Sequence, residues 1–370
     1  MVIKEVDIRP YAVYSDTPLT TEQIWKALND TNAQRAHYTR LRNYYVGKHD
    51  ILLRQYTDAT KPNNRNVLNY CSQITDFYTS YTVGEPVEYK GIDAATTAAF
   101  EENDEPIQTF NTAQNLCNFG MAAEIFYMKD GKPKFKAVEP IEIIPVLSTD
   151  IEHELLGFIR LYTVGEYGFV DYYTDTTMQH HLLETGNLTL QSTGTHGFTR
   201  PPIAFYKNDK GVYEQLIGIQ NAINTLCSDI VNDFEVITDS LLVIPGHMDT
   251  DPEQIQRMKQ NRVLLTGTDT KPYWLEKTAD RSFGQGILDR FIHVIKEKSG
   301  LPDMERLGSY GASGRSLQFK LIVTDIIATS IERALSKGIA ARFEVLGVPT
   351  PEIIFTRNFI IEEQPDDSVA

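Results

Sequence analysis

Residues 213–240 read YEQLIGIQNAINTLCSDIVNDFEVITDS, and this stretch decides how the rest of the chain is interpreted. Its apolar residues recur every three or four positions, at Leu216, Ile219, Ile223, Leu226, Ile230, Phe234 and Ile237. That spacing is typical of one face of an α-helix, and the stretch contains no proline that would interrupt it. Its charged residues are all acidic: Glu214, Asp229, Asp233, Glu235 and Asp239. The sequence therefore predicts one long helix with a purely acidic flank.

Further segments follow this helix in a definite order. Residues 241–276 alternate short apolar runs with polar turns, which predicts a small α/β insert. Residues 284–299 form a second helical pattern that ends at Gly300, with Pro302 beyond it. A Gly- and Ser-rich loop over 302–314 leads to a third long helical pattern over 315–346, which Gly347 terminates. A strand at 352–356 and an acidic tail over 361–370 complete the chain.

The N-terminal half combines helices with a β-rich segment. One long helix is expected from Thr20 to about Tyr45, a second over 63–81 and a third over 107–121. Strands at 124–128 and 134–138 predict a hairpin, and short strands with turns follow over 143–205. The whole chain is predicted to be an α+β protein, and its 370 residues are enough for two or three domains.

The composition argues against several classes of protein. Lys and Arg total 35 against 50 Asp and Glu, a formal net charge of −15, so a basic nucleic-acid-binding face is not expected. Such a chain could still surround nucleic acid without gripping it. No apolar run approaches the length of a membrane span and no signal peptide is evident, so we expect a soluble chain that is not secreted. The three cysteines, Cys71, Cys117 and Cys227, indicate core thiols in a reducing compartment.

The best signal for an enzyme is a glycine-containing loop. The run Ser309–Ser316 approximates the spacing of a phosphate-binding loop that opens a helix. However, Ser309 stands where the first glycine belongs, and Arg315 stands where the lysine belongs. A helix end precedes the run where a strand is required. A flexible connector between helices is therefore favoured.

Signals for metal binding and for a catalytic triad are also weak. His180 and His181 are adjacent in a predicted strand and point to opposite faces, which favours surface polar residues over a metal site. Asp229 and Asp233 share a helix face and could hold a hard cation, but no third ligand is evident. No Ser, His and Asp set has the spacing of a triad. We therefore predict a protein without a metal, a cofactor or catalysis of its own.

The acidic flank of the 213–240 helix needs a physical reason. Like charges at i,i+4 spacing destabilise an isolated helix by a few tenths of a kcal/mol per pair. If several copies packed through their apolar stripes, the acidic flanks would line a common surface, along which a polyanion slides instead of sticking. A plain solvent-exposed face is the alternative that spacing alone leaves open.

Several stretches, taken in order, resemble one family. They are YYVGKHDIL at 44–52, KPNNRNVLNY at 61–70, YTVGEPV at 81–87, Asn118–Ala122 with Glu139 and Pro140, Gln215–Phe234, Gly311–Gly314, and Ile354–Asn358. Each is short, but their order is specific, as is the succession of helix, α/β insert, helix, Gly-rich loop and helix. The chain resembles the portal proteins of tailed bacteriophages, of the SPP1-like class, over about residues 20–360.

The resemblance implies a portal fold and a ring of about twelve subunits at one capsid vertex, possibly thirteen when isolated. By this resemblance, residues 1–212 and 315–360 form a mixed α/β wing, and 213–240 and 277–301 form the helical stem. Residues 241–276 form the clip and 302–314 a tunnel loop. The family's helical crown is expected to be short or absent. The protein would be made in the cytoplasm of the host bacterium and end in the virion, with no membrane contact.

The resemblance also assigns partners and site residues. Double-stranded DNA would pass through the channel without sequence specificity, lined at the stem by Asp229, Asp233, Glu235 and Asp239. The tunnel loop would present Met304, Glu305, Arg306, Leu307, Gly308, Ser309, Tyr310 and Gly311. The clip would dock the large terminase subunit and later a head-completion adaptor through Asp249, Asp251, Glu253, Gln256, Arg257, Lys259 and Gln260. Scaffold and major capsid protein would be further partners.

Two alternatives remain at this point. Another phage head–tail connector or a minor head protein would lack the order of stem, clip and tunnel loop. A nucleotide-binding enzyme would use the loop Ser309–Ser316. Solvation of a short helix is the simpler interpretation of the polar clip residues, and an ordinary connector is the simpler interpretation of the tunnel loop.

Overall fold

The computed structural model describes residues 11–56, 61–238, 241–245, 263–266, 273–275, 281–302 and 314–357. The chain divides into two compact units. The first comprises Met1–Val46, Cys71–Gln215 and Ser299–Ala370, and the second comprises Gly47–Tyr70 and Leu216–Lys298. Both helices and sheets are present, so the predicted α+β class is confirmed. The finer division into wing, stem, clip and tunnel loop stays a prediction.

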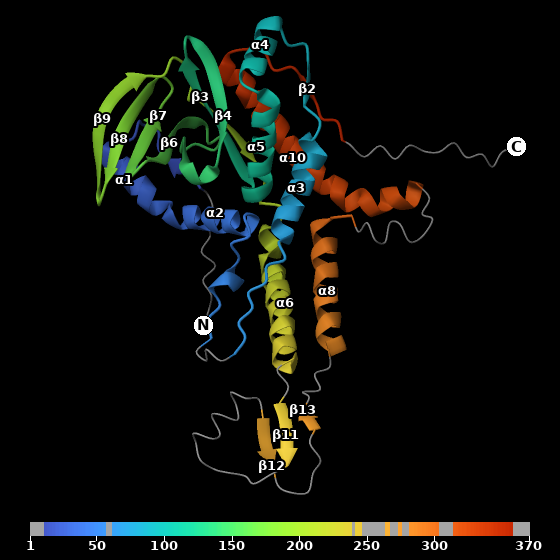
Figure 1. The fold of residues 1–370 in the computed structure, drawn as a ribbon. Coiled ribbons are helices and arrows are strands. Elements are labelled where there is room, and N and C mark those ends of the chain that lie inside the picture. The colour runs from blue at the N-terminus through green and yellow to red at the C-terminus, as the bar shows by residue number, and fades with distance from the viewer. Residues whose placement is uncertain are drawn as a thin grey trace, which may run out of the picture. The chain divides into compact units, whose positions relative to one another are not determined.

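A six-stranded sheet forms one part of the first unit, in the order β1-β5-β6-β7-β8-β9 (Figure 1). Its strands are β1 (Val13–Tyr14), β5 (Ile143–Leu147), β6 (Leu155–Val164), β7 (Tyr167–Tyr173), β8 (Thr177–Glu184) and β9 (Asn187–Thr195). From β5 to β9 each strand pairs antiparallel with the next, whereas β1 runs parallel to β5. The β-rich segment predicted over 143–205 is confirmed.

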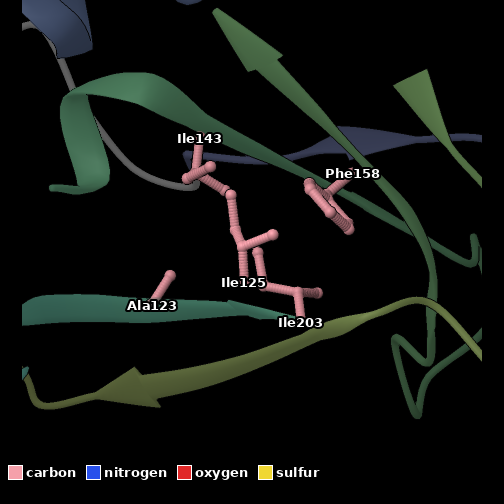
Figure 2. Close-up of a cluster of buried hydrophobic side chains, with 5 residues drawn as sticks. All are labelled: Ala123, Ile125, Ile143, Phe158 and Ile203. Atoms are coloured by element: carbon pink, nitrogen blue, oxygen red, sulfur yellow. The ribbon is translucent and has the colours of Figure 1, made fainter. Parts of the chain in front are cut away.

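A three-stranded sheet in the order β10-β3-β4 forms another part of this unit. The predicted hairpin is confirmed as β3 (Met121–Lys129) and β4 (Lys132–Val138), and β10 (Ile203–Lys207) pairs antiparallel with β3. Side chains of β3, β5, β6 and β10 meet in a buried cluster of Ala123, Ile125, Ile143, Phe158 and Ile203 (Figure 2). Removing this apolar surface from water is the main driving force that holds the two sheets together.

Helices pack beside these sheets. Helix α5 (Glu105–Phe119) ends at Gly120, whose φ of 71° is a left-handed C-cap, and α4 (Ala94–Glu102) precedes it. Helix α10 (Gly314–Leu346) passes along β10, and Gly347 follows its end with a φ of 71°. Short elements complete the unit: β2 (Glu88–Lys90) paired with β14 (Glu352–Ile354), and the 3-10 turn η2 (Pro140–Glu142).

The N-terminal helix is interrupted, contrary to the prediction of one continuous helix. Helix α1 (Thr21–Asp30) starts at a capping box in which Thr20 and Gln23 bond each other's backbone. It ends at Thr31, whose hydroxyl donates to the Ala27 carbonyl, and α2 (Asn32–Tyr45) begins on the next residue. A threonine that bonds back to the preceding turn offers the backbone an alternative to continuing the helix.

The helix predicted over 63–81 also begins later than expected. Helix α3 spans Tyr70–Val83, and residues 61–69 before it contain no helix or strand. Backbone amides of this preceding segment donate to side chains more than 150 residues away along the chain, as at Asn66 and Leu68. These long-range bonds replace the intrahelical bonds that the local pattern predicts.

The second unit contains helices α6 (Ile217–Thr238) and α8 (Arg281–Ser299), which confirm the helices predicted at 213–240 and 284–299 (Figure 1). A 3-10 turn, η3 (Glu214–Leu216), leads into α6, and another, η1 (Asp50–Leu53), belongs to the second unit. Gly284 of α8 lies against Ile230 of α6. Strands β11 (Leu241–Pro245), β12 (Val263–Thr266) and β13 (Tyr273–Leu275) form a small sheet in the order β12-β11-β13. None of the described helices is long and apolar enough to cross a membrane.

Candidate functional site: the faces of helix α6

The apolar stripe of helix α6 becomes more exposed toward its C-terminal end. Ile223 is fully buried, whereas Ile230 is 36% exposed and Phe234 is 57% exposed. All three belong to the same stripe, because successive members lie seven and four residues apart. Within the single chain, the second half of this stripe is therefore incompletely covered.

A second face of α6 carries neutral polar side chains at every fourth residue. They are Gln220, Asn224, Ser228 and Asn232, and the first three are fully buried. Within this stripe the Gln220 amide donates to Asn224, and the Ser228 hydroxyl donates to the Asn224 carbonyl. Asn224 also contacts His49, with 2.7 Å between Nδ2 and Nδ1. Buried polar groups need such partners, since an unpaired one costs roughly 1–3 kcal/mol.

The acidic flank lies next to this polar stripe, and its first member is not a free charge. Asp229 Oδ1 accepts a hydrogen bond of 2.6 Å from Nη1 of Arg54, whose side chain is 15% exposed. The Arg54 guanidinium also donates to the Asn64 carbonyl and lies 5.1 Å from the Tyr56 ring centre. Asp229 thus belongs to an ion pair that joins α6 to the segment near Arg54.

The other predicted channel residues differ in what the structure says of them. Asp233 and Glu235 are described and exposed, while Asp239 lies outside the described residues. Glu214, which precedes α6, instead contacts His37, with 3.1 Å between Oε1 and Nε2. The described acidic flank of α6 therefore consists of Asp229, Asp233 and Glu235.

Sequence reasoning missed Arg54 as the partner of Asp229. The helix itself contains no basic residue between Ile217 and Thr238, as the sequence indicated. The counter-charge comes from a position 175 residues away. No local spacing could have revealed this pair.

The whole predicted tunnel set from Met304 to Gly311 lies outside the described residues, and so do all seven predicted clip residues between Asp249 and Gln260. Of the loop Ser309–Ser316, the described part begins at Gly314, where α10 starts. The roles of these residues stay predictions.

The two adjacent histidines do point to different surroundings, but they are not both surface residues. His180 Nδ1 lies 2.6 Å from the buried Asp171 carboxylate, and its ring stacks on Phe169. His181 is fully buried, so its predicted surface position is wrong. Burial lowers the pKa of His181, which favours the neutral ring. The reason is register: alternate residues of β8 face opposite sides, and the side of His181 is covered.

Metal binding finds no geometric support in the described part of the chain. No group of three His, Cys, Asp or Glu side chains is close enough there to hold an ion. Asp229 and Asp233 were the two carboxylates considered for a cation. The Arg54 guanidinium already binds Asp229. A cation at this pair would have to displace Arg54.

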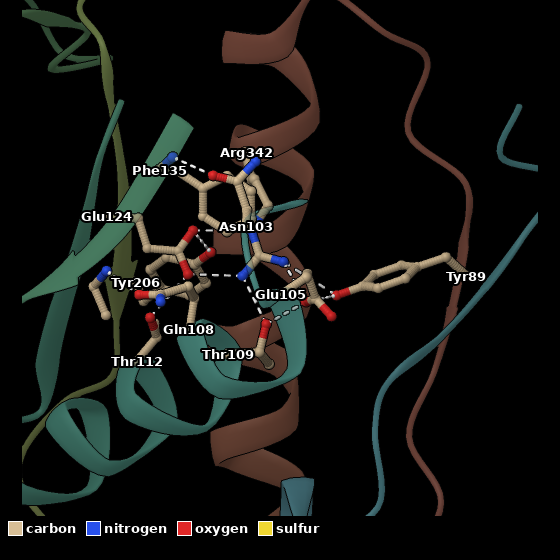
Figure 3. A network of polar contacts seen from close by, with 11 residues as sticks. Tyr89, Asn103, Glu105, Gln108, Thr109, Thr112, Glu124, Phe135, Tyr206 and Arg342 are labelled. Carbon is tan, nitrogen blue, oxygen red and sulfur yellow. Dashed lines mark hydrogen bonds and ion pairs between the residues drawn. The ribbon is translucent and has the colours of Figure 1, made fainter. Parts of the chain in front are cut away.

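A buried polar network in the first unit was also missed by sequence reasoning (Figure 3). Arg342 of α10 is fully buried and donates to two carboxylates, those of Glu105 on α5 and Glu124 on β3, at 2.5 and 2.7 Å. The Tyr206 hydroxyl donates to Glu124 at 2.7 Å, and the Tyr89 hydroxyl donates to Glu105 at 2.5 Å. One arginine thus ties elements from distant parts of the chain together, which makes it a structural group.

Comparison with known proteins gives consistent results. A sequence model of the family "Phage portal protein, SPP1 Gp6-like" matches residues 26–348. The portal protein of Clostridium phage phiCD119 is 24% identical over an alignment that covers 94% of this chain and 88% of that protein. The portal protein of Bacillus phage SPP1 is 22% identical, over 82% of this chain and 65% of that protein. The present chain therefore spans most of the first relative and slightly less than two thirds of the second.

Proposed function

The chain belongs to the SPP1 Gp6-like family of phage portal proteins, and from this premise we propose that it forms a closed ring of about twelve copies through which double-stranded DNA enters and leaves the capsid. Phage portal proteins are virion components. In this proposal the ring occupies one capsid vertex and contributes no catalysis, because the large terminase supplies the ATPase. The observation that carries the proposal is the family match over residues 26–348.

The charge distribution of the chain supports a conduit for DNA. The net charge of −15 makes tight, phosphate-neutralising contacts unfavourable, because such contacts require a basic surface. Helix α6 carries no basic residue and exposes Asp233 and Glu235. A ring would repeat these two carboxylates once per subunit, and a wall of negative charge keeps a polyanion mobile.

The partly exposed apolar stripe of α6 supports assembly. Ile230 and Phe234 are exposed in the single chain, although they continue the stripe that buries Ile223. Exposed apolar side chains on one helix face gain free energy when another surface covers them, at about 25 cal/mol per Å². In the proposed ring, neighbouring subunits provide that cover.

The insert at 241–276 and the loop at 302–314 complete the proposal. Following the family resemblance, the insert docks the large terminase and later a head-completion adaptor, and the loop reaches into the bore. Scaffold and major capsid protein contact the assembled ring. The small sheet β12-β11-β13 gives the insert a folded framework on which polar docking residues could be mounted.

Native mass spectrometry of the purified protein, with negative-stain images of the same sample, tests the ring. Twelve copies of the 42.0 kDa chain weigh about 504 kDa, and thirteen weigh about 546 kDa. A particle of either mass with a central hole is the expected result. A chain that stays monomeric alone and also fails to assemble with scaffold protein would contradict the proposal.

Charge substitutions test the role of α6 in DNA passage. The pair Asp233→Asn and Glu235→Gln should leave the ring mass unchanged but reduce the amount of nuclease-protected DNA in a terminase-driven packaging reaction, with the deficit depending on salt. The matched control is Glu166→Gln with Glu184→Gln, which removes the same charge from exposed hairpin tips. Equal packaging by both variants across salt concentrations would show that the α6 carboxylates do not face the DNA.

A further inference from the structure

Residues 61–70 lie along α6, and we call this segment the strap. Its alternate backbone amides donate to the polar stripe of α6: Asn64 to Asn232 at 2.8 Å, Asn66 to Ser228 at 2.9 Å, Leu68 to Asn224 at 3.0 Å, and Tyr70 to Gln220 at 3.0 Å. Each step of two residues along the strap corresponds to a step of four residues backward along the helix. The two segments therefore run antiparallel and are joined by four successive hydrogen bonds, which we call the ladder.

The two repeat lengths explain why this arrangement works. Two residues of extended chain advance about 6.6 Å, and four residues of α-helix advance about 6.0 Å. A polar side chain at every fourth helical residue therefore meets every second amide of an extended chain. The mismatch grows by roughly 0.6 Å per step, so the match holds over a few rungs and not over a long segment.

Carbonyl groups of the strap are held as well. The Gln220 side chain donates to the Leu68 carbonyl at 2.6 Å, and Arg54 donates to the Asn64 carbonyl at 2.6 Å. At Leu68 and at Asn64, both the amide and the carbonyl group are thus bonded to side chains. In a β-sheet, an edge strand forms such hydrogen bonds with the backbone of the neighbouring strand. Here side chains take the place of that backbone.

We infer that the polar stripe of α6 is a surface that binds extended backbone, and that it holds α6 in position through the strap. Gln220, Asn224, Ser228 and Asn232 are then positioning residues, and the pair of Arg54 with Asp229 secures the end of the strap nearest Asn64. Full burial of Gln220, Asn224 and Ser228 supports this role, because none of these side chains is available to solvent or to DNA.

The consequence for DNA passage rests on the proposed function. If α6 lines the bore, the strap fixes the part of the helix from Gln220 to Asn232, and the exposed carboxylates Asp233 and Glu235 begin where the ladder ends. Asp229 instead binds Arg54, the residue that also holds the Asn64 carbonyl of the strap. Neutralising Asp229 should therefore loosen the strap, because it removes the carboxylate that Arg54 binds.

Hydrogen exchange on the full-length protein, resolved to single amides, tests the ladder. Among the described contacts, the amides of Asn64, Asn66 and Leu68 have acceptors and those of Arg65 and Val67 have none. We expect slow exchange at 64, 66 and 68 and exchange at least roughly tenfold faster at 65 and 67, which is the effect of one ordinary hydrogen bond on an opening equilibrium. Equal exchange along the segment would overturn the inference.

A single substitution locates the effect. Ser228→Ala removes the acceptor of the Asn66 amide, which should then exchange roughly tenfold faster, with smaller changes at its neighbours. Thr225→Ala is the control, since it deletes an exposed hydroxyl from another face of the same helix. If the two variants change Asn66 equally, the stripe does not hold the strap. Should Ser228→Ala fold poorly, the wild-type alternation at 64–68 still decides.

The ladder and the proposed function can fail separately. Alternating exchange in a protein that never forms a ring would support the inference about the strap and contradict the proposed role of α6 in a portal ring. A ring that packages DNA but whose amides at residues 64–68 exchange equally fast would support the proposed function and contradict the inference about the strap.

Discussion

The closest approach between α10 and β10 gives the sharpest stability prediction. Gly338 of α10 faces the Tyr206 ring, and a Cβ atom placed on Gly338 would lie 2.1 Å from Cδ1 of that ring. Real Cβ contacts are never this short, so one of the two elements would have to move. Tyr206 cannot move easily, because it is fully buried and its hydroxyl is bonded to Glu124, which Arg342 holds in turn.

The expected effect of Gly338→Ala is the balance of two terms. In a helix interior, alanine is more favourable than glycine by about 0.8–1 kcal/mol. Overpacking a rigid core costs about 1–3 kcal/mol, and the short contacts to three atoms of one ring favour the upper part of that range. Gly338→Ala should therefore destabilise the first unit by about 1–2 kcal/mol, which corresponds to a fall in melting temperature of roughly 2–8 °C.

Scanning calorimetry of the variant beside Gly286→Ala provides the comparison. Gly286 lies in helix α8 with open space where its Cβ would be, so this substitution should stabilise its own unit by up to about 1 kcal/mol. The two glycine replacements thus have opposite expected signs. The Gly338→Ala cost should also shrink when Tyr206 is first replaced by alanine, because the double mutant has room for the methyl group.

Two outcomes would refute this reasoning. If Gly338→Ala raises the melting temperature as Gly286→Ala does, the helix and the ring are not in close contact. If the cost of Gly338→Ala is the same with and without the Tyr206 ring, the steric explanation is wrong even though the variant is less stable.

Two further predictions concern buried groups of the first unit. Arg342→Met should lower the free energy of unfolding by about 3–5 kcal/mol, measured by chemical denaturation, because it leaves two buried glutamates without their counter-charge; full stability of Arg342→Met would mean that the network is not buried as described. Burial raises the pKa of Cys71 and of Cys117 to about 12 each, so at pH 8 both remain thiols. A thiol-specific reagent should then modify neither in the folded protein and both after denaturation, as read by peptide mass spectrometry, and rapid native labelling of either would contradict their burial.

Local signals in the sequence located the long helices well. The apolar spacing with Gly300 and Gly347 as stops predicted helices at 284–299 and 315–346, and the structure has α8 over Arg281–Ser299 and α10 over Gly314–Leu346. These signals are reliable because an apolar stripe and a C-terminal glycine act within one or two turns. The hairpin at β3 and β4 was predictable for the same reason.

The failures occurred where distant parts of the chain compete with local preference. Val67 and Tyr70 continue the apolar spacing of α3, yet the residues before Tyr70 are bonded to α6 instead of forming a further helical turn. Likewise, the helix pattern from Thr20 to Tyr45 gave no sign that Thr31 would interrupt it. In both cases a side-chain hydrogen bond outweighs a propensity difference of a few tenths of a kcal/mol per residue.

The site shows the same limit more clearly. A stripe of neutral polar residues such as Asn224 and Ser228 on a predicted helix is ordinarily assigned to solvent, and an acidic residue beside it is counted with its acidic neighbours. The structure separates these groups, because Asp229 shares Arg54 with the strap, whereas Asp233 and Glu235 are exposed beyond it. A test of the bore that includes Asp229 would therefore mix a loss of helix support with a change of charge. Substituting the exposed pair Asp233 and Glu235 leaves the Arg54–Asp229 ion pair in place, so this pair is the better test of the electrostatic effect on DNA.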